Sequence, residues 1–286
     1  MSDRVDAWRA AGAREEFRGH GIHVYQREGK GPPLVLLHGF PSSSFDWRAF
    51  LERETERAVL AFDYLGFGLS DKPRDHDYSL HWQADLAEEL VRRHLDGPVF
   101  VVGHDVGTSV ATELMARDLA GRLAMEIAGV LLFNGSILQE RANLTPAQRL
   151  LRSPLGPVAA RLTSKRFFLD QFGSIFSDEH PLTPDEGEDQ WELLTENGGH
   201  RLGHRLIGYM RERSIYAERW HGAFRDWPGD LSLLWGLKDP VAHVDLLGGL
   251  RELRPGVPVA ELPDAGHYPQ IEVPDRFAEI MRDALA

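Results

Sequence analysis

Short apolar runs separated by helical patterns fill the first half of the chain. Strands are predicted over residues 22–27, 33–37, 58–62, 98–102 and 127–133, and helices over 80–95 and 108–119. Such alternation is typical of parallel sheets, because a helix usually connects one parallel strand to the next. The pattern therefore predicts an α/β fold with a mostly parallel sheet.

The strand rhythm stops near residue 137 and returns at residue 231. Strands are predicted again over 231–235 and 257–261, with a closing helix over 277–285. The segment between them predicts amphipathic helices, each with one apolar face that includes Leu150, Leu155, Val158, Leu162, Phe167, Phe168 and Phe172. A helical insert of this kind is typical of a lid over the strand ends, where ligands bind in open α/β sheets. We therefore expect a core of residues 1–136 and 226–286 and a helical cap of residues 137–225.

Residues 101–109 read Val-Val-Gly-His-Asp-Val-Gly-Thr-Ser, an apolar strand followed by a tight turn and the start of a helix. Asp105 stands between Gly103 and Gly107. This pattern is typical of a nucleophile elbow, a strained turn that presents one side chain above the sheet. Glycines suit the flanking positions, because a larger residue would clash across the turn. We interpret Asp105 as a nucleophile.

An aspartate at an elbow predicts a particular kind of reaction. An ionised carboxylate attacks without a base and forms an ester with the enzyme. It is a poor nucleophile toward amides and esters, but it can displace a leaving group from a saturated carbon. The sequence therefore favours epoxide opening or halide expulsion over ester cleavage.

Asp239 and His267 each follow a predicted strand, so they are expected at the same sheet edge as Asp105. Their order along the chain, nucleophile then acid then histidine, is the order found in elbow enzymes. His267 would activate water to hydrolyse the ester, and Asp239 would orient the imidazole and stabilise its cation. Taken singly, a helix-capping Asp239 and a loop His267 are the alternatives. Together with the elbow, the three residues predict a catalytic triad.

The segment His38-Gly39-Phe40-Pro41 directly follows a buried strand. We expect the backbone amides of Phe40 and Val106 to form an oxyanion hole for the ester of the nucleophile. His38, Gly39 and Pro41 are interpreted as structural, with His38 hydrogen-bonding the loop. The Phe40–Pro41 peptide is a candidate for the cis form, since cis-proline occurs in such turns.

With these motifs the chain resembles the superfamily of epoxide hydrolases and haloalkane dehalogenases, and within it proteins of the mesoderm-specific transcript type. The resemblance rests on residues 36–47 and 63–73, on the elbow, and on 216–224, 236–240 and 266–272. It extends from Trp8 to the last helix. It implies an α/β-hydrolase fold, in which helices flank a mostly parallel eight-stranded sheet and a helical cap covers it.

The resemblance also indicates which residues would stabilise the leaving group of the substrate. Epoxide hydrolases usually protonate it with two lid tyrosines, and this lid offers Tyr209 and Tyr216. Tyr209 lies nearer the family's second position, while residues 167–176, around the first, contain phenylalanines. Haloalkane dehalogenases usually hold the halide with side-chain donors at the positions of Val106 and Phe40, which cannot donate. Fluoroacetate dehalogenases carry arginines shortly after the aspartate, and residues 106–110 contain none.

The composition excludes several classes of binding partner and of chemistry. A formal net charge of -12 argues against nucleic acid or an anionic membrane as partner. The absence of cysteine excludes disulfides and thiolate chemistry. Residues 1–6 lack the layout of a signal peptide, and no apolar run approaches the roughly 20 residues that span a bilayer. We expect a cytoplasmic monomer or homodimer with a small hydrophobic substrate, no cofactor, no metal, no nucleic-acid partner and no membrane span.

Epoxide hydrolysis through Asp105 is the leading interpretation. A haloalkane dehalogenase-like hydrolase and a non-catalytic binding protein of the same fold are the alternatives. A cap that closed over Asp105 without leaving a pocket would favour the binding protein.

Overall fold

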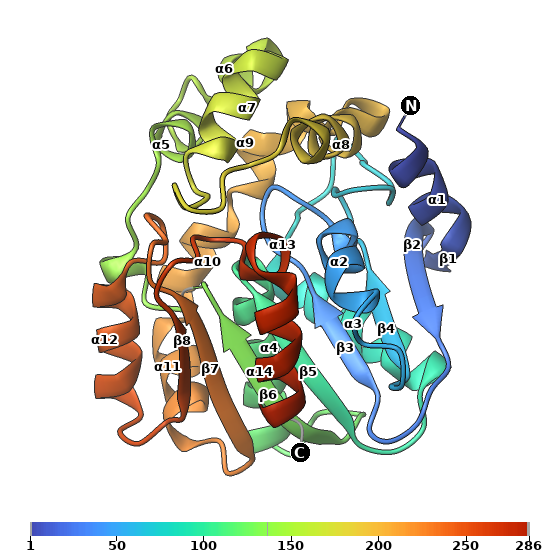
Figure 1. Ribbon diagram of the computed structural model, residues 1–286, viewed down its shortest axis with the longest axis vertical. Coiled ribbons are helices and arrows are strands. Elements are labelled where there is room, and N and C mark those ends of the chain that lie inside the picture. The colour runs from blue at the N-terminus through green and yellow to red at the C-terminus, as the bar shows by residue number, and fades with distance from the viewer. Residues whose placement is uncertain (1, 136, 285–286) are drawn as a thin grey trace.

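A computed structural model describes residues 2–135 and 137–284. Its centre is an eight-stranded sheet with the strand order β1-β2-β4-β3-β5-β6-β7-β8 (Figure 1). β2 pairs antiparallel with both β1 and β4, and all the other neighbours are parallel. The predicted mostly parallel eight-stranded sheet is confirmed.

The strands are β1 (Ala13–Phe17), β2 (His20–Arg27), β3 (Leu34–Leu37), β4 (Val59–Phe62), β5 (Val99–His104), β6 (Ile127–Phe133), β7 (Asp230–Gly236) and β8 (Val259–Leu262). Seven of them match predicted strands to within two residues at each end. The sequence pattern missed β1, which reads Ala-Arg-Glu-Glu-Phe. β1 is an edge strand with one neighbour and mostly exposed side chains, so it lacks the apolar run by which a strand is predicted.

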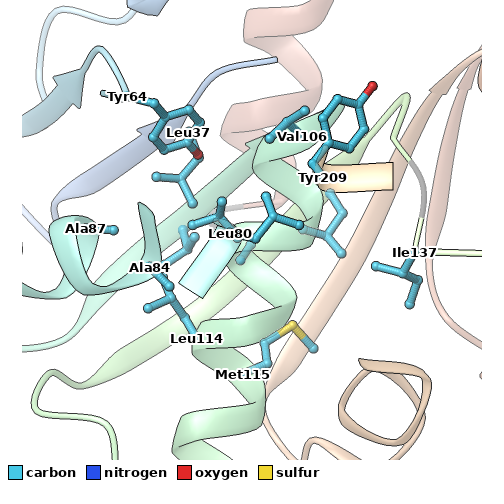
Figure 2. Packing of buried hydrophobic residues seen from close by; sticks show 14 of the residues in the cluster. Leu37, Tyr64, Leu80, Ala84, Ala87, Val106, Leu114, Met115, Ile137 and Tyr209 are labelled. Carbon is cyan, nitrogen blue, oxygen red and sulfur yellow. The ribbon is translucent and has the colours of Figure 1, made fainter. Parts of the chain in front are cut away.

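Helices cover both faces of the sheet, namely α1 (Asp3–Ala11), η1 (Ser44–Trp47), α2 (Arg48–Leu51), α3 (Leu80–His94), α4 (Val106–Leu119), α11 (Ala217–Asp226), α12 (Val244–Leu253), α13 (Pro269–Glu272) and α14 (Pro274–Ala284). Side chains alternate along β3, as the pleat requires. Val35 and Leu37 pack with residues of α3, α4 and α11, whereas Leu34 and Leu36 pack with residues of α1, α2 and α14. Figure 2 shows the first of these layers, with Leu37 beside side chains of α3 and α4.

The insert between β6 and β7 is helical, as predicted. It contains η2 (Gln139–Arg141), α5 (Pro146–Arg152), α6 (Gly156–Leu162), α7 (Lys165–Gly173), α8 (Pro184–Thr195), η3 (Glu196–Leu202), α9 (Gly203–Leu206) and α10 (Tyr209–Ile215) before α11. Figure 1 shows α5 to α9 above the sheet. Tyr209 packs against Phe40, just past the carboxyl end of β3, so the insert lies over that edge. Within the predicted cap range, α11 packs on core helix α4 through a 2.9 Å hydrogen bond from Trp220 Nε1 to Glu113.

The predicted apolar face of the insert divides into a buried and an exposed part. Phe168 and Phe172 are buried, and Phe172 packs against Tyr268 of the core. The other five residues, Leu150, Leu155, Val158, Leu162 and Phe167, are 40–75% exposed. A face of α5, α6 and α7 therefore points away from the core.

Candidate active site

Asp105 occupies a sharp turn between β5 and α4. Its backbone angles, φ 43° and ψ -104°, are ones that residues other than glycine rarely adopt. A Cβ added at Gly103 would lie 2.7 Å from the carbonyl oxygen of Gly107, and one added at Gly107 would collide with the carbonyl of Leu37. Close backbone approach therefore requires both glycines, as expected for a nucleophile elbow.

The carboxylate of Asp105 is buried and already bonded by one predicted donor. The Phe40 amide donates a 2.9 Å hydrogen bond to Asp105 Oδ2. The other predicted donor, Val106, begins α4, and within the described chain its amide makes no hydrogen bond to this carboxylate. A Cβ added at Gly39 would lie 3.0 Å from Asp105 Cβ, so the glycine lets the loop approach the elbow.

The loop after β3 is held by His38. The Tyr64 amide donates to His38 Nε2 at 3.0 Å, so Nδ1 carries the proton and donates to the Gly39 carbonyl at 2.8 Å. Burial lowers the pKa of His38, which keeps the ring neutral. The Phe40–Pro41 peptide is cis. The expected cis form of this peptide is confirmed.

Asp239 and His267 form a buried hydrogen-bonded pair, with 2.7 Å between Asp239 Oδ2 and His267 Nδ1. The backbone amides of Val241 and Ala242 donate to the other oxygen of Asp239 at 2.7 and 3.0 Å. Asn134, which follows β6, donates to Asp239 Oδ2 at 2.8 Å. The sequence analysis missed Asn134, although a polar residue directly after a buried strand was a usable signal.

The pKa of His267 is raised above the usual histidine value. Burial opposes the charged ring, but the charge of Asp239 and its hydrogen bond outweigh burial, and the charge of Asp105 adds to them. His104 supports the position of His267, since its Nε2 lies 2.8 Å from the His267 carbonyl oxygen. The fold thus brings Asp105, Asp239 and His267 to one edge of the sheet.

The two candidate lid acids lie in different surroundings. Tyr209 is buried, its ring centroid 5.7 Å from that of Phe40, and burial together with the charge of Asp105 raises its pKa. Figure 2 shows its hydroxyl directed away from the packed aliphatic side chains. This hydroxyl has no hydrogen-bond partner in the described part of the chain. Tyr216 instead packs against His81 and Trp220, over helices of the core.

Arg213 of α10 is a site residue that the sequence analysis did not find. Its side chain is 3% exposed, with Nη2 3.7 Å from Asp105 Oδ1 and donating to the Asp105 carbonyl at 3.1 Å. Nε donates to Ser109 Oγ at 2.8 Å, and the guanidinium carbon lies 4.6 Å from the ring centroid of Tyr209. Arg213 follows Tyr209 by four residues on one helix face, a spacing that could have indicated it.

An apolar cavity of about 120 Å³ lies between the cap helices and the loop after β3. Phe40 and Pro41 line it next to the elbow, and Leu150 and Phe167 line it where the cap is exposed. The cavity therefore extends from the surface of the cap to the neighbourhood of Asp105. Phe40, which donates to Asp105, lines this cavity, whereas Asp105 and Tyr209 do not.

Residues 2–135 and 137–284 contain no group of three or more His, Cys, Asp or Glu side chains arranged to hold a metal ion. In the same residues, no helix combines the length and the hydropathy needed to cross a bilayer.

The chain belongs to the alpha/beta hydrolase family, whose model matches residues 34–280. It is 53% identical over 278 residues to "Putative hydrolase LipZ" from Mycobacterium tuberculosis, covering 97% of this chain and 96% of that protein. It is 35% identical over 295 residues to the mesoderm-specific transcript homolog protein from Homo sapiens, covering 97% and 86%. The predicted resemblance is therefore confirmed, and the fold and family are those of hydrolases.

Solved structures agree on the fold. The haloalkane dehalogenase DatA from Agrobacterium tumefaciens matches with a TM-score of 0.79 at 22% identity, covering 96% of this chain and 95% of that one. The epoxide hydrolase CorEH matches with a TM-score of 0.76 at 18% identity, covering 95% and 97%. At these identities the likeness concerns the fold alone.

Proposed function

We propose that this hydrolase opens epoxides through an ester on Asp105, with Asp105, Asp239 and His267 as its catalytic triad. One observation carries the proposal: a carboxylate at the elbow faces a cap that supplies a buried tyrosine, whose hydroxyl has no hydrogen-bond partner among residues 2–135 and 137–284. Burial raises the pKa of Tyr209, and the charge of Asp105 adds to this effect, which supports placing the two groups near each other. Ring opening requires a nucleophile and a proton donor, and we assign these roles to Asp105 and Tyr209.

In the first step, a carboxylate oxygen of Asp105 attacks a ring carbon of the epoxide. The bond between that carbon and the ring oxygen breaks, and the oxygen takes the proton of Tyr209 as it leaves. The product is an alkyl ester of Asp105 that carries a neighbouring hydroxyl. Because its pKa is raised, Tyr209 stays protonated until the leaving oxygen becomes basic.

In the second step, His267 removes a proton from water, and the hydroxide attacks Cγ of Asp105. The amides of Phe40 and Val106 would stabilise the oxyanion, and Phe40 already donates to Oδ2. Collapse breaks the bond between Cγ and the alkyl oxygen, which takes the hydroxyl proton of the intermediate. This releases a vicinal diol and restores the carboxylate. Asp239 stabilises the imidazolium, which returns its proton to the tyrosinate or to solvent.

The cavity indicates the kind of substrate. A cavity of about 150 Å³ holds a benzene molecule, and the space here is about 120 Å³. Its lining is largely apolar, so we propose a small hydrophobic epoxide. In the division that we propose, the cap of residues 137–225 supplies most of this lining and the acid, and the core of residues 1–136 and 226–286 supplies the triad.

Arg213 favours dehalogenation as a second candidate. A guanidinium 3.7 Å from Asp105 Oδ1 could hold a departing halide, for which no proton donor is needed. A binding protein without turnover is less favoured, because the cavity reaches Phe40 beside the elbow.

The direct test is turnover of styrene oxide and 1-bromobutane by the wild-type protein and an Asp105→Ala variant. Diol formation that depends on Asp105 and outpaces bromide release supports the proposal. Faster bromide release would favour the dehalogenase, and no turnover across a wider panel of both classes would favour the binding protein.

A further inference from the structure

Helix α6 presents an apolar ridge to the surface of the protein. Leu155, Val158 and Leu162 are 64%, 55% and 75% exposed. Their spacing of three and four residues places them on one helix face. Ala160, on the opposite face, is fully buried, so α6 is anchored in the cap while its larger apolar side chains point outward. Three neighbouring side chains of this kind form a patch rather than scattered exposure.

The ridge continues onto the two neighbouring helices. Leu150 of α5 and Phe167 of α7 are 40% and 42% exposed, and both line the apolar cavity that reaches Phe40. The exposed apolar surface therefore borders the way into the cavity.

The charge around the ridge is opposite to that of the chain as a whole. Residues 145–173 contain five basic residues and one acidic residue, a formal charge of +4 in a chain of -12. Lys165 pairs with Glu188 of α8. Among the residues that the structure describes, Arg149, Arg152, Arg161 and Arg166 have no carboxylate within ion-pair distance. These arginines are therefore available to bind anions of another molecule.

Two basic hollows adjoin α6, and both are lined by Pro157 and His204. The larger, about 630 Å³, is lined by Lys72, Arg74, Arg161, Arg201 and Arg205, with Asp75 as its one acidic residue. The smaller, about 460 Å³, contains Arg152 and Arg211 and no acidic residue. Both hollows border α6 at Pro157, on the helix that carries the ridge, and both suit anionic groups.

We propose that this surface, formed by the ridge and the arginines of the two hollows and here called the cap face, docks on membranes that contain anionic phospholipid. The apolar side chains would enter the boundary between headgroups and acyl chains, and the arginines would meet the phosphates. Net charge alone argued against an anionic membrane, but docking depends on the local charge. The inference concerns binding and does not depend on the chemistry at Asp105.

The test measures sedimentation of the full chain with vesicles of phosphatidylcholine alone, or of phosphatidylcholine mixed with phosphatidylglycerol. The wild type should bind the mixed vesicles, with affinity that falls as salt is raised. A Leu155→Ser, Val158→Ser, Leu162→Ser variant should bind at least tenfold more weakly. An Arg152→Gln, Arg161→Gln, Arg211→Gln variant should lose about 10²-fold, at roughly 1 kcal/mol per cation near an anionic surface.

Controls lie at the far end of α4. Leu119 is 48% exposed, and Arg122 is exposed in the following turn, so Leu119→Ser and Arg122→Gln change the same chemistry away from the cap face. Both should bind vesicles like the wild type, and thermal melts of all variants confirm that they fold. Equal binding by the cap-face and control variants overturns the proposal. So does a wild type that ignores mixed vesicles but forms a dimer that the ridge substitutions dissociate, because the ridge would then be an interface between copies.

Discussion

Arg213 and Asp105 form a buried pair across the boundary between the cap helix α10 and the elbow. The side chains are 3% and 7% exposed. Arg213 contacts the elbow in two ways, through an ion pair with the Asp105 carboxylate and through a hydrogen bond to the Asp105 carbonyl oxygen. Burying a carboxylate costs several kcal/mol unless a partner compensates it, and Arg213 is that partner. The cap therefore contributes to the stability of the nucleophile.

Replacing Arg213 with Met should destabilise the protein by about 3 kcal/mol, because it leaves a buried charge uncompensated. Urea unfolding measures the change. Arg213→Lys should recover part of the loss, since it keeps the charge but not the bonds to Ser109 and the Asp105 carbonyl. Arg225→Met, which breaks an exposed pair with Asp226, should have no measurable effect. Equal stability of Arg213→Met and the wild type would show that the pair has no such role.

Replacing His267 with Gln should trap the ester. Asp105 attacks without help from the imidazole, whereas hydrolysis of the ester needs a base. Intact-mass spectra after addition of styrene oxide should show the protein plus one substrate. The adduct should be absent in His243→Gln, which changes an exposed histidine, and in an Asp105→Ala, His267→Gln double variant. An adduct in that double variant would exclude Asp105 as the nucleophile.

Replacing Tyr209 with Phe should lower epoxide turnover by about 10²-fold, the usual effect of losing a general acid. The ring packing against Phe40 is kept, so the fold should not change. Tyr216→Phe is the matched control, because Tyr216 packs against His81 and Trp220. Similar rates for Tyr209→Phe and the wild type would remove the acid from the proposal and favour dehalogenation.

Local backbone crowding explains why the elbow could be predicted. Positions 103 and 107 have no room for a side chain, so the turn requires glycine at two positions close to Asp105 in the sequence. Asn134 and Arg213 could not be placed in the same way, since each acts on a residue about a hundred positions away. The periodicity around Leu155 and Leu162 predicted an apolar face, but periodicity does not say whether the face has a partner within the chain.

Ester hydrolysis should depend on pH through His267. The reaction needs the neutral ring, and the pKa of His267 is raised, so the rate should rise with pH through a midpoint above the usual value of about 6.5. In Asp239→Asn the raising charge is gone and burial remains, so the midpoint should fall. The rate should also fall, by about 10⁴-fold as in other triads. Single-turnover decay of the ester in the wild type and in Asp239→Asn, followed against pH, measures both, and an unchanged midpoint would contradict the role given to Asp239.

The same pair affects stability with a definite sign. A group whose pKa is raised on folding stabilises the protein fully below its unfolded pKa, and this contribution is lost as pH rises through the folded pKa. Relative to His267→Gln, the wild type should therefore lose stability as pH rises above about 6.5. Urea unfolding at a series of pH values tests this, and a stability difference that does not vary with pH would contradict it.

Asp46 should make the protein less stable as pH rises. Its carboxyl is fully buried, with Ser42 donating to Oδ2 and Gln190 of α8 donating to Oδ1 at 2.8 Å. Burial, assisted by the nearby charge of Glu186, raises the pKa of Asp46 to about 7. An unfolded aspartate titrates near 3.9, so between about 4 and 7 only the folded state holds the proton. The free energy of unfolding therefore falls across this range and levels off above it.

An Asp46→Asn variant, which removes this titration, should be more stable than the wild type at pH 8 by up to about 4 kcal/mol. The gap should shrink as pH falls to 5. The wild type releases the proton of Asp46 when it unfolds, and this release favours the unfolded state less at lower pH. Asp283→Asn, on the exposed end of α14, is the control and should show no such trend. If Asp46→Asn is destabilised equally at both pH values, the buried carboxylate is charged in the folded protein and its bonds to Ser42 and Gln190 hold the cap in that form.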